Sequence, residues 1–280
     1  MRRHRTEKIR QFITWVLSVA IITIMLFPVA WTFLTSIKDP AEIFDYPPSL
    51  LSENPTLVNY IYVLTQTAIP KQLINSIFVA IAAILITIIA SSLAGYSLAR
   101  SRLKGKNALS LAILAIHMVS GIGNVIALYI IAYQLRLLDS LPFLALIYAS
   151  AATPFSVWFM RGYFEKIPTE LEDAAMVDGC SRWQSFFRIS IPLAAPALVT
   201  VSLYSFAIAW NEFIIASILL SSETKKTLPL GIYSFVTFHG GFEWGYITAT
   251  AIIGVLPVLV LFLSLQKYFL AGLMGGSLKE

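Results

Sequence analysis

Long apolar runs separated by shorter polar stretches dominate this chain of 280 residues. Six runs are long enough to cross a membrane: 12–34, 73–98, 108–133, 142–160, 194–220 and 246–269. A helix of about 20 residues rises roughly 30 Å, the thickness of the hydrocarbon core, and satisfies its own backbone hydrogen bonds there. The pattern therefore predicts an all-α membrane protein with one six-span domain over residues 12–270. It is flanked by an N-terminal segment, 1–11, and a C-terminal tail, 271–280.

The composition agrees with a membrane protein, because 58% of the residues are hydrophobic and only 12% are charged. The basic N-terminus precedes an apolar run that is too long for a signal peptide and has no cleavage site, so we expect a retained anchor. A single cysteine excludes an internal disulfide. The three histidines are too scattered to predict a metal site. Nucleic-acid binding would need a basic face with interleaved aromatic residues outside the membrane, and none is present.

The basic residues predict the orientation of the chain. Fifteen of the 20 Lys and Arg residues lie before the first run, after the second, in the 161–193 segment, or near the end of the sixth and beyond it. Because cytoplasmic loops carry the excess of Lys and Arg, we expect both termini and the 161–193 segment in the cytoplasm.

The 161–193 segment is polar and charged, which indicates contact with something in water. Thr169 and Glu172 have the spacing of a capping box and predict the start of a short helix, which Gly179 would end in the left-handed conformation. The adjacent methyl groups of Ala174 and Ala175 would form a flat patch on which another protein can dock.

A second capping box, Ser181 with Gln184, predicts an amphipathic helix. Its apolar face would hold Trp183, Phe186 and Phe187. Arg182 and Arg188 would stay in water. The alternative is an ordinary interfacial loop, with this helix lying on lipid headgroups.

The order of these features resembles the cytoplasmic coupling loop of binding-protein-dependent ABC importer permeases. In that family the pattern is Glu-Ala-Ala, three residues, Gly, nine residues and Ile-x-Leu-Pro. Here Asp173-Ala174-Ala175, Gly179 and Ile189-Ser190-Ile191-Pro192 reproduce the spacing. Asp173 stands where the family has Glu, so the resemblance does not establish which contact the Asp173 carboxylate makes. Glu172, just before it, is the alternative for the role.

Further blocks at 35–44, 210–213, 227–231 and 266–273 narrow the resemblance to the carbohydrate branch and to the smaller membrane subunit of maltose-type importers. This resemblance implies a permease that forms half of the translocation pathway of an ATP-driven sugar importer, with oligosaccharides or glycosides as the expected substrates. The implied partners are a second permease, forming a heterodimer, a cytoplasmic ATPase dimer, an extracytoplasmic sugar-binding protein and membrane lipid. The implied location is the bacterial or archaeal cell (inner) membrane.

The resemblance also implies a chain that is not an enzyme and holds no cofactor, with ATP and Mg bound by the partner ATPase. The chain lacks the phosphate-binding loop of ATPases, in agreement with this. The residues implied for ATPase coupling are Glu172, Asp173, Ala174, Ala175 and Gly179. The tail, at Gly275, Gly276 and Ser277, is implied to reach the ATPase, and a frayed terminus is the alternative.

Polar residues inside the spans are candidates for the translocation pathway, because each is costly in lipid unless it faces a partner or a cavity. His117, Ser120 and Asn124 share one helix face, and Asn211 with Glu212 lies toward the outer half of the fifth span. The alternatives are interhelical packing for the first group and a structural hydrogen bond or ion pair for Glu212.

The 221–245 loop is aromatic and contains glycines, and the resemblance implies contact with the sugar-binding protein at Phe238, His239, Gly240 and Gly241. An aromatic belt at the lipid headgroups is the alternative. Two other functions remain to be weighed for the whole chain. A secondary transporter would carry matching broken helices in two halves, which we do not find, and a membrane-embedded enzyme would need convergent catalytic groups at one depth.

Overall fold

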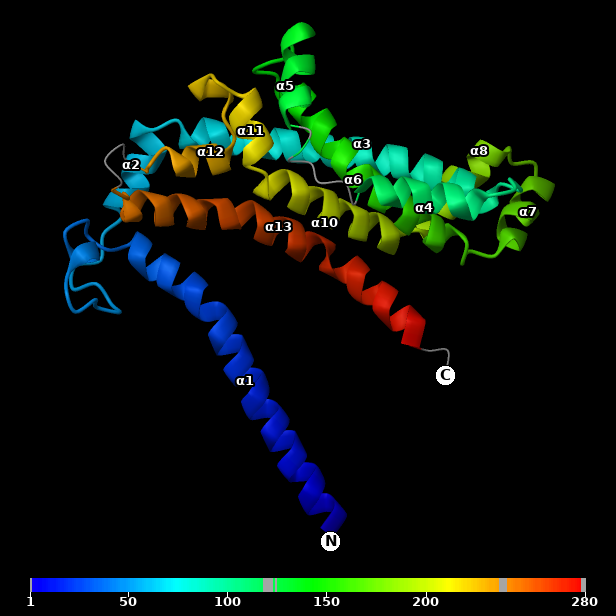
Figure 1. The fold of residues 1–280 in the computed structure, drawn as a ribbon. Coiled ribbons are helices and arrows are strands. Elements are labelled where there is room, and N and C mark those ends of the chain that lie inside the picture. The colour runs from blue at the N-terminus through cyan, green and yellow to red at the C-terminus, as the bar shows by residue number, and fades with distance from the viewer. Residues whose placement is uncertain (1, 118–122, 124, 237–240, 278–280) are drawn as a thin grey trace. The chain divides into compact units, whose positions relative to one another are not determined.

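The computed structural model describes residues 2–117, 123, 125–236 and 241–277 (Figure 1). The chain divides into two compact units, one of residues 1–70 with 232–256 and the other of residues 71–231 with 257–280. Within the described residues the regular secondary structure is helical, apart from one isolated β-bridge between Val236 and Phe242. The predicted all-α fold is confirmed.

Four single helices are long and apolar enough to cross a membrane: α1 (Arg2–Ser36), α3 (Ile69–Arg100), α6 (Leu141–Phe164) and α13 (Trp244–Ser277). They cover the first, second, fourth and sixth predicted runs. The third run falls on two shorter apolar helices, α4 (Lys106–His117) and α5 (Val125–Gln134). The prediction of one continuous apolar run over 108–133 did not reveal this division.

The fifth run is also divided. It contains α10 (Ala195–Asn211) and α11 (Ile214–Leu219), which are separated because Glu212 has an extended backbone. Before α10, the segment Arg182–Leu193 meets it at a bend of 75°, and the two together are long and apolar enough to cross a membrane. This segment comprises α8 (Arg182–Ser185), the π-helix η3 (Phe186–Ser190) and α9 (Ile191–Leu193).

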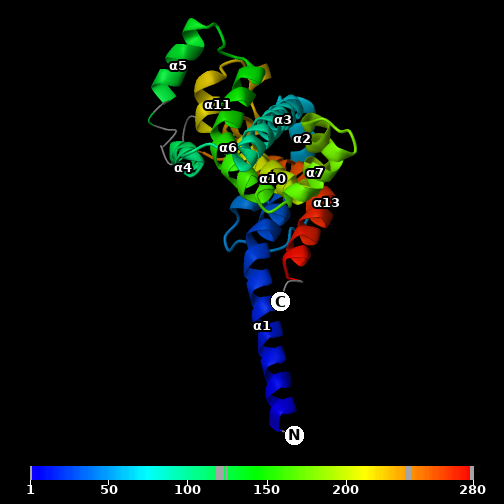
Figure 2. The ribbon, with the colours of Figure 1, turned by 90° about the vertical axis from the view of Figure 1, so that its right-hand side faces the viewer.

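The 71–231 unit is built around α6, which packs against both α10 and α4 (Figure 2). The face of α6 that is buried carries small residues, including Ala149 and Ala152, and such residues let membrane helices approach closely. Gly95 of α3 serves the same purpose. A Cβ atom there would lie 2.8 Å from the Cβ of Met160 on α6.

Four short helices complete the described elements of the chain: α2 (Val58–Gln66), α7 (Thr169–Val177), α12 (Leu228–Tyr233) and the 3-10 helix η4 (Glu223–Lys225), with a further 3-10 turn, η1, at Glu42–Phe44. Figure 1 shows α7 and α8 together at one end of α3, α4 and α6. The loop predicted to meet a partner is therefore carried on the ends of the long helices.

The other unit is held together where α1 ends. Asn59 of α2 donates hydrogen bonds to the carbonyls of Ser36 (3.0 Å) and Lys38 (2.9 Å). Tyr62 stacks on Tyr246, with ring centroids 4.3 Å apart. Residues 11–30 of α1 are exposed along their whole length, which suits a helix that meets lipid or another subunit.

Candidate functional site in the loop between α6 and α10

The first helix of the loop, α7, forms as expected but begins differently. Its N-cap is Pro168, with no side-chain capping bond, and Thr169 is already the first helical residue. The predicted capping box is therefore wrong, because the Glu172 carboxylate is engaged elsewhere. The predicted end is confirmed: Gly179 has φ +88°, and the N–H of Cys180 donates to the carbonyl of Ala175 at 2.9 Å.

Glu172 is the centre of this site. It is only 6% exposed, and its carboxylate accepts hydrogen bonds from side chains of two other elements. Arg100 Nη2 and Ser190 Oγ each lie 2.7 Å from Oε1, and Tyr96 Oη lies 2.9 Å from Oε2. Arg100 also donates to the carbonyl of Ile167 at 3.0 Å. One side chain thus joins α7 to the end of α3 and to η3.

The surroundings keep Glu172 ionised. Burial alone would raise the pKa of its carboxyl group, but the hydrogen bonds from Arg100, Ser190 and Tyr96 and the charge of Arg100 together hold that pKa below its ordinary value. The ionised carboxylate is the form that pairs with Arg100. This connection of Glu172 with Arg100, Tyr96 and Ser190, which we call the Glu172 joint, is therefore intact at neutral pH.

The second part of the loop is anchored by an apolar core. The predicted capping box of Ser181 with Gln184 is confirmed at the start of α8. Phe186 is 2% exposed, and its ring centroid lies 4.7 Å from that of Tyr96. Trp183 and Phe187 remain largely exposed. The buried cluster around Phe186 consists of Met160, Phe164, Ile167, Phe186, Ala194, Ala197 and Val201.

Burial divides the five residues that were predicted to couple to an ATPase. Asp173, Ala174 and Gly179 are exposed, whereas Glu172 and Ala175 are buried within the chain. The two adjacent methyl groups therefore do not share one outer face.

The outer face of α7 instead presents Leu171, Ala174 and Val177, spaced three residues apart, with Val177 88% exposed. We call these three residues the α7 stripe. The residues that sequence reasoning missed are Arg100, Tyr96 and Ser190. No local motif marks Arg100 or Tyr96, since Arg100 and Glu172 are 72 positions apart. Ser190 stands within the Ile-x-Ile-Pro block, but at its variable position.

The structure describes part of the candidate translocation pathway. His117 is exposed, and its Nε2 lies 3.0 Å from the hydroxyl of Tyr204 on α10. The ring of Phe155 on α6 lies 4.5 Å from that of Tyr204, so three helices contribute to one aromatic and polar cluster. Sequence reasoning did not identify these two aromatic residues. Ser120 and Asn124 lie outside the described residues.

Glu212 has structural partners. Its carboxylate accepts the backbone N–H groups of Ile215 (2.8 Å) and Ala216 (3.0 Å) and the hydroxyl of Tyr148 (2.7 Å). It therefore caps α11 and fastens the helix break to α6, which supports the structural alternative. Asn211 is exposed and donates to the carbonyl of Ala207 at 2.9 Å.

At the opposite end of α3, polar side chains hold the segment that follows α11. Asn75 donates to the carbonyls of Thr224 (3.0 Å) and Lys226 (2.8 Å), and Ser76 Oγ accepts the N–H of Leu228 at 2.8 Å.

The remaining predicted contacts are only partly described. Gly241 is exposed beside the Val236 to Phe242 bridge, and Phe238, His239 and Gly240 lie outside the described residues. The backbone at Gly275, Gly276 and Ser277 continues helix α13. A contact of these residues with an ATPase stays a prediction.

Long apolar helices, with a polar loop attached to their ends through the buried carboxylate of Glu172, define an integral membrane protein. Residues 7–274 match the family described as "Binding-protein-dependent transport system inner membrane component", and the chain belongs to this family. It is a multi-pass membrane protein and a component of such a transport system.

Curated relatives extend over nearly the whole chain. It is 32% identical over 277 residues to the trehalose/maltose transport system permease protein of Thermococcus litoralis, covering 98% of this chain and 99% of that protein. It is 35% identical over 254 residues to the sulfoquinovosyl glycerol transport system permease protein of Agrobacterium fabrum, covering 91% and 89%.

A solved structure also matches. It is a bacterial ABC transporter involved in the import of the acidic polysaccharide alginate. One of its chains has a TM-score of 0.80 and 26% identity, covering 95% of this chain and 98% of that one. The predicted resemblance to carbohydrate-type importer permeases is confirmed.

Proposed function

We propose that this chain is one permease subunit of an ATP-driven sugar importer and that the segment 169–191 couples it to a cytoplasmic ATPase. The observation that carries this proposal is the pairing of an exposed α7 stripe with a buried Glu172 joint directly behind it. A docking surface without such a joint would move independently of the bundle.

The joint gives the coupling a physical route. A force applied to α7 reaches α3 through Arg100 and reaches η3, and hence α10, through Ser190. Because packed helices move as rigid bodies, displacement of α7 would turn the helices together and alternate the access of the pathway. In this scheme Glu172 and Ala175 act from inside the chain, and Asp173, Ala174 and Gly179 act at the contact.

The orientation and partners belong to the same proposal. The excess of Lys and Arg supports a cytoplasmic location of both termini and of α7 in a bacterial or archaeal cell. A second permease would complete the pathway, and two ATPase subunits would supply the energy, with ATP and Mg bound by them. An extracytoplasmic sugar-binding protein would deliver the substrate to the 221–245 loop, at Phe238, His239, Gly240 and Gly241.

The substrate class follows the names of the relatives, which are disaccharide, glycoside and oligosaccharide transporters. We propose an oligosaccharide or glycoside. The cluster of exposed His117 with half-buried Tyr204 and Phe155 suits such a ligand, because aromatic rings stack on sugar faces while polar tips meet hydroxyl groups. The C-terminal residues Gly275, Gly276 and Ser277 would meet the ATPase dimer.

The test is transport by the complete complex in liposomes. ATP inside, binding protein outside and a panel of labelled mono- and oligosaccharides should give uptake of a subset of the sugars. Ala174→Arg places a bulky charge on the α7 stripe and should abolish ATPase co-purification. Leu103→Arg, at an exposed position in the turn between α3 and α4 and not on α7, is the control and should retain it. Uptake that runs on an ion gradient without ATP would contradict the proposal.

A further inference from the structure

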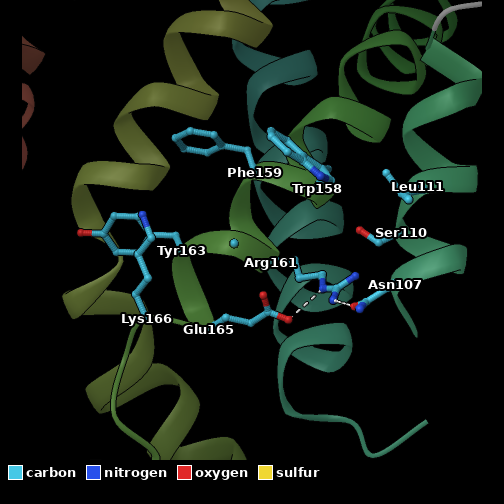
Figure 3. A pocket seen from close by; sticks show the side chains of 10 residues that line it. Asn107, Ser110, Leu111, Trp158, Phe159, Arg161, Tyr163, Glu165 and Lys166 are labelled. Carbon is cyan, nitrogen blue, oxygen red and sulfur yellow. Dashed lines mark hydrogen bonds and ion pairs between the residues drawn. The ribbon is translucent and has the colours of Figure 1, made fainter. Parts of the chain in front are cut away.

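A cavity of about 600 Å³ lies between the first turns of α4 and the last turns of α6 (Figure 3). It takes no part in the joint at Glu172. Its walls come from Asn107, Ser110 and Leu111 on α4, and from the stretch between Trp158 and Lys166 at the end of α6. The cavity therefore opens at the level where the long helices leave the membrane and the loop begins.

The lining changes from apolar to polar along the helices. Figure 3 shows Trp158, Phe159 and Leu111 at one end and Asn107, Glu165 and Lys166 at the other. Trp158 is 42% exposed and Leu111 60% exposed, so the apolar end is open at its side. A ligand that fits this gradient has one oily and one polar part.

The charges of the lining are unevenly compensated. Arg161 is fully engaged: it donates to Glu165 (3.0 Å), to the carbonyl of Lys106 (2.9 Å) and to the side chain of Asn107. Glu165 in turn faces Lys106 Nζ at 3.8 Å. Lys166 forms no ion pair within the described part of the chain, so the cavity keeps one uncompensated positive charge.

Ser110 provides a second, independent observation. Its residue is 2% exposed, its hydroxyl group has no hydrogen-bond partner among the described residues, and it lines the cavity. A buried hydroxyl without a partner is costly, so a ligand atom that accepts a hydrogen bond from Ser110 would be favoured.

We infer that this cavity binds an anionic phospholipid of the cytoplasmic leaflet. Its phosphate oxygens would accept hydrogen bonds from Ser110 and Lys166, and an acyl chain would lie against Leu111 and Trp158. Basic pockets between membrane helices on the cytoplasmic side recognise such headgroups, and Trp and Tyr side chains favour the headgroup level. The inference rests on the proposed function only for the orientation of the chain.

The experiment is a count of bound lipid on the complete transporter. The complex is equilibrated in nanodiscs of phosphatidylcholine with a minor share of phosphatidylglycerol, extracted into detergent and analysed by native mass spectrometry. The wild-type complex should retain phosphatidylglycerol. Lys166→Ala should lower retention about fivefold, the equivalent of one lysine near an anionic surface. Ser110→Ala should also lower retention, because it removes a hydrogen-bond donor to the phosphate. Lys104→Ala, an exposed cation that does not line the cavity, is the control and should leave retention unchanged.

Several outcomes would overturn the inference. Equal retention of both lipids, or retention that neither variant lowers, would exclude an anionic headgroup. Displacement by inorganic phosphate as effective as displacement by phosphatidylglycerol would indicate a site for the free ion. A photo-cross-linker at Leu111 that captures the second permease instead of lipid would show that a subunit covers the cavity. Sugar uptake, measured on the same samples, reports separately on the proposed function.

Discussion

Two carboxylates hold loops against the unit built on α3, α6 and α10, and they use different donors. Glu172 is buried, and side chains bind it, one of them the cation Arg100. Asp139 is half-buried and binds mainly backbone: it accepts the N–H groups of Ser221 (2.7 Å) and Ser222 (3.0 Å). Water can replace a lost bond at Asp139. At Glu172 a lost bond leaves the largely buried guanidinium of Arg100 without its carboxylate, so that joint tolerates little change.

The largest expected effect comes from removing only one of the two charged partners, Glu172 or Arg100. Glu172→Leu leaves the guanidinium of Arg100 largely buried without its partner, which should lower the free energy of unfolding by about 3 to 5 kcal/mol. Thermal unfolding of the purified complex measures it. Glu170→Leu, at an exposed position of the same helix, should have little effect.

The double variant Glu172→Leu with Arg100→Leu sharpens this prediction. It removes both charges and should recover much of the lost stability, yet transport should stay uncoupled from ATP hydrolysis because the link from α7 to α3 is gone. Full recovery of coupled transport would show that the joint is only structural.

The next largest loss of stability is expected at the contact between α3 and α6. Gly95→Ala places a Cβ atom 2.8 Å from the Cβ of Met160 and 2.9 Å from the backbone nitrogen of Arg161, so the helices must separate. We expect a loss of about 1 to 3 kcal/mol, measured by thermal unfolding. Gly162→Ala, also within a helix but with open space around it, is the matched control and should be neutral.

Substitutions at Gly179 test whether its left-handed backbone is what ends α7. Its φ of +88° is strained for a β-branched residue, and no neighbouring atom would clash. Gly179→Val should cost about 1 to 2 kcal/mol locally and misalign the α7 stripe, which raises ATP hydrolysis relative to transport. Gly179→Asn should be milder, since Asn tolerates the left-handed region. If Gly179→Val and Gly179→Asn gave the same ratio of ATP hydrolysis to transport, the effect would not come from the backbone conformation at this position.

The smallest effect is expected at Asp139. The N–H of Ser222 lowers the pKa of its carboxyl group most, partial burial opposes this, and Ser221 adds to the lowering. A lowered folded pKa means that the stabilisation is present above the ordinary Asp value and is lost as the pH falls through the folded value. Asp139→Asn should remove this pH dependence and cost about 1 kcal/mol or less. Hydrogen exchange of residues 219–222 against pH is the measurement.

Much of the α7 loop could be predicted because its signals are local. Gly179 needs no partner to end a helix, and Ser181 with Gln184 closes a capping box over three residues. Thr169 with Glu172 has the same local signature, yet the box does not form. Arg100 competes for the carboxylate from 72 positions away and offers a charged donor, so it prevails over a backbone N–H.

The pathway candidates show the same limit. His117 is exposed, and its place on one helix face with Ser120 and Asn124 stays a prediction. Tyr204, which contacts it, comes from another helix 87 positions later. Glu212 was identified as a rare carboxylate in an apolar run. Only the structure shows it capping α11 at a break in the run.

By itself the sequence determined the class of the protein, the approximate spans and the position of the polar loop with its short helix α7, because hydrophobic period, length and turn chemistry act over a few residues. The tertiary structure decided which side of α7 faces outward, which carboxylate is the buried joint and where the long runs break. Those depend on which distant side chains reach one another, and a polar group in an apolar interior takes the strongest donor within reach, whatever its place in the chain.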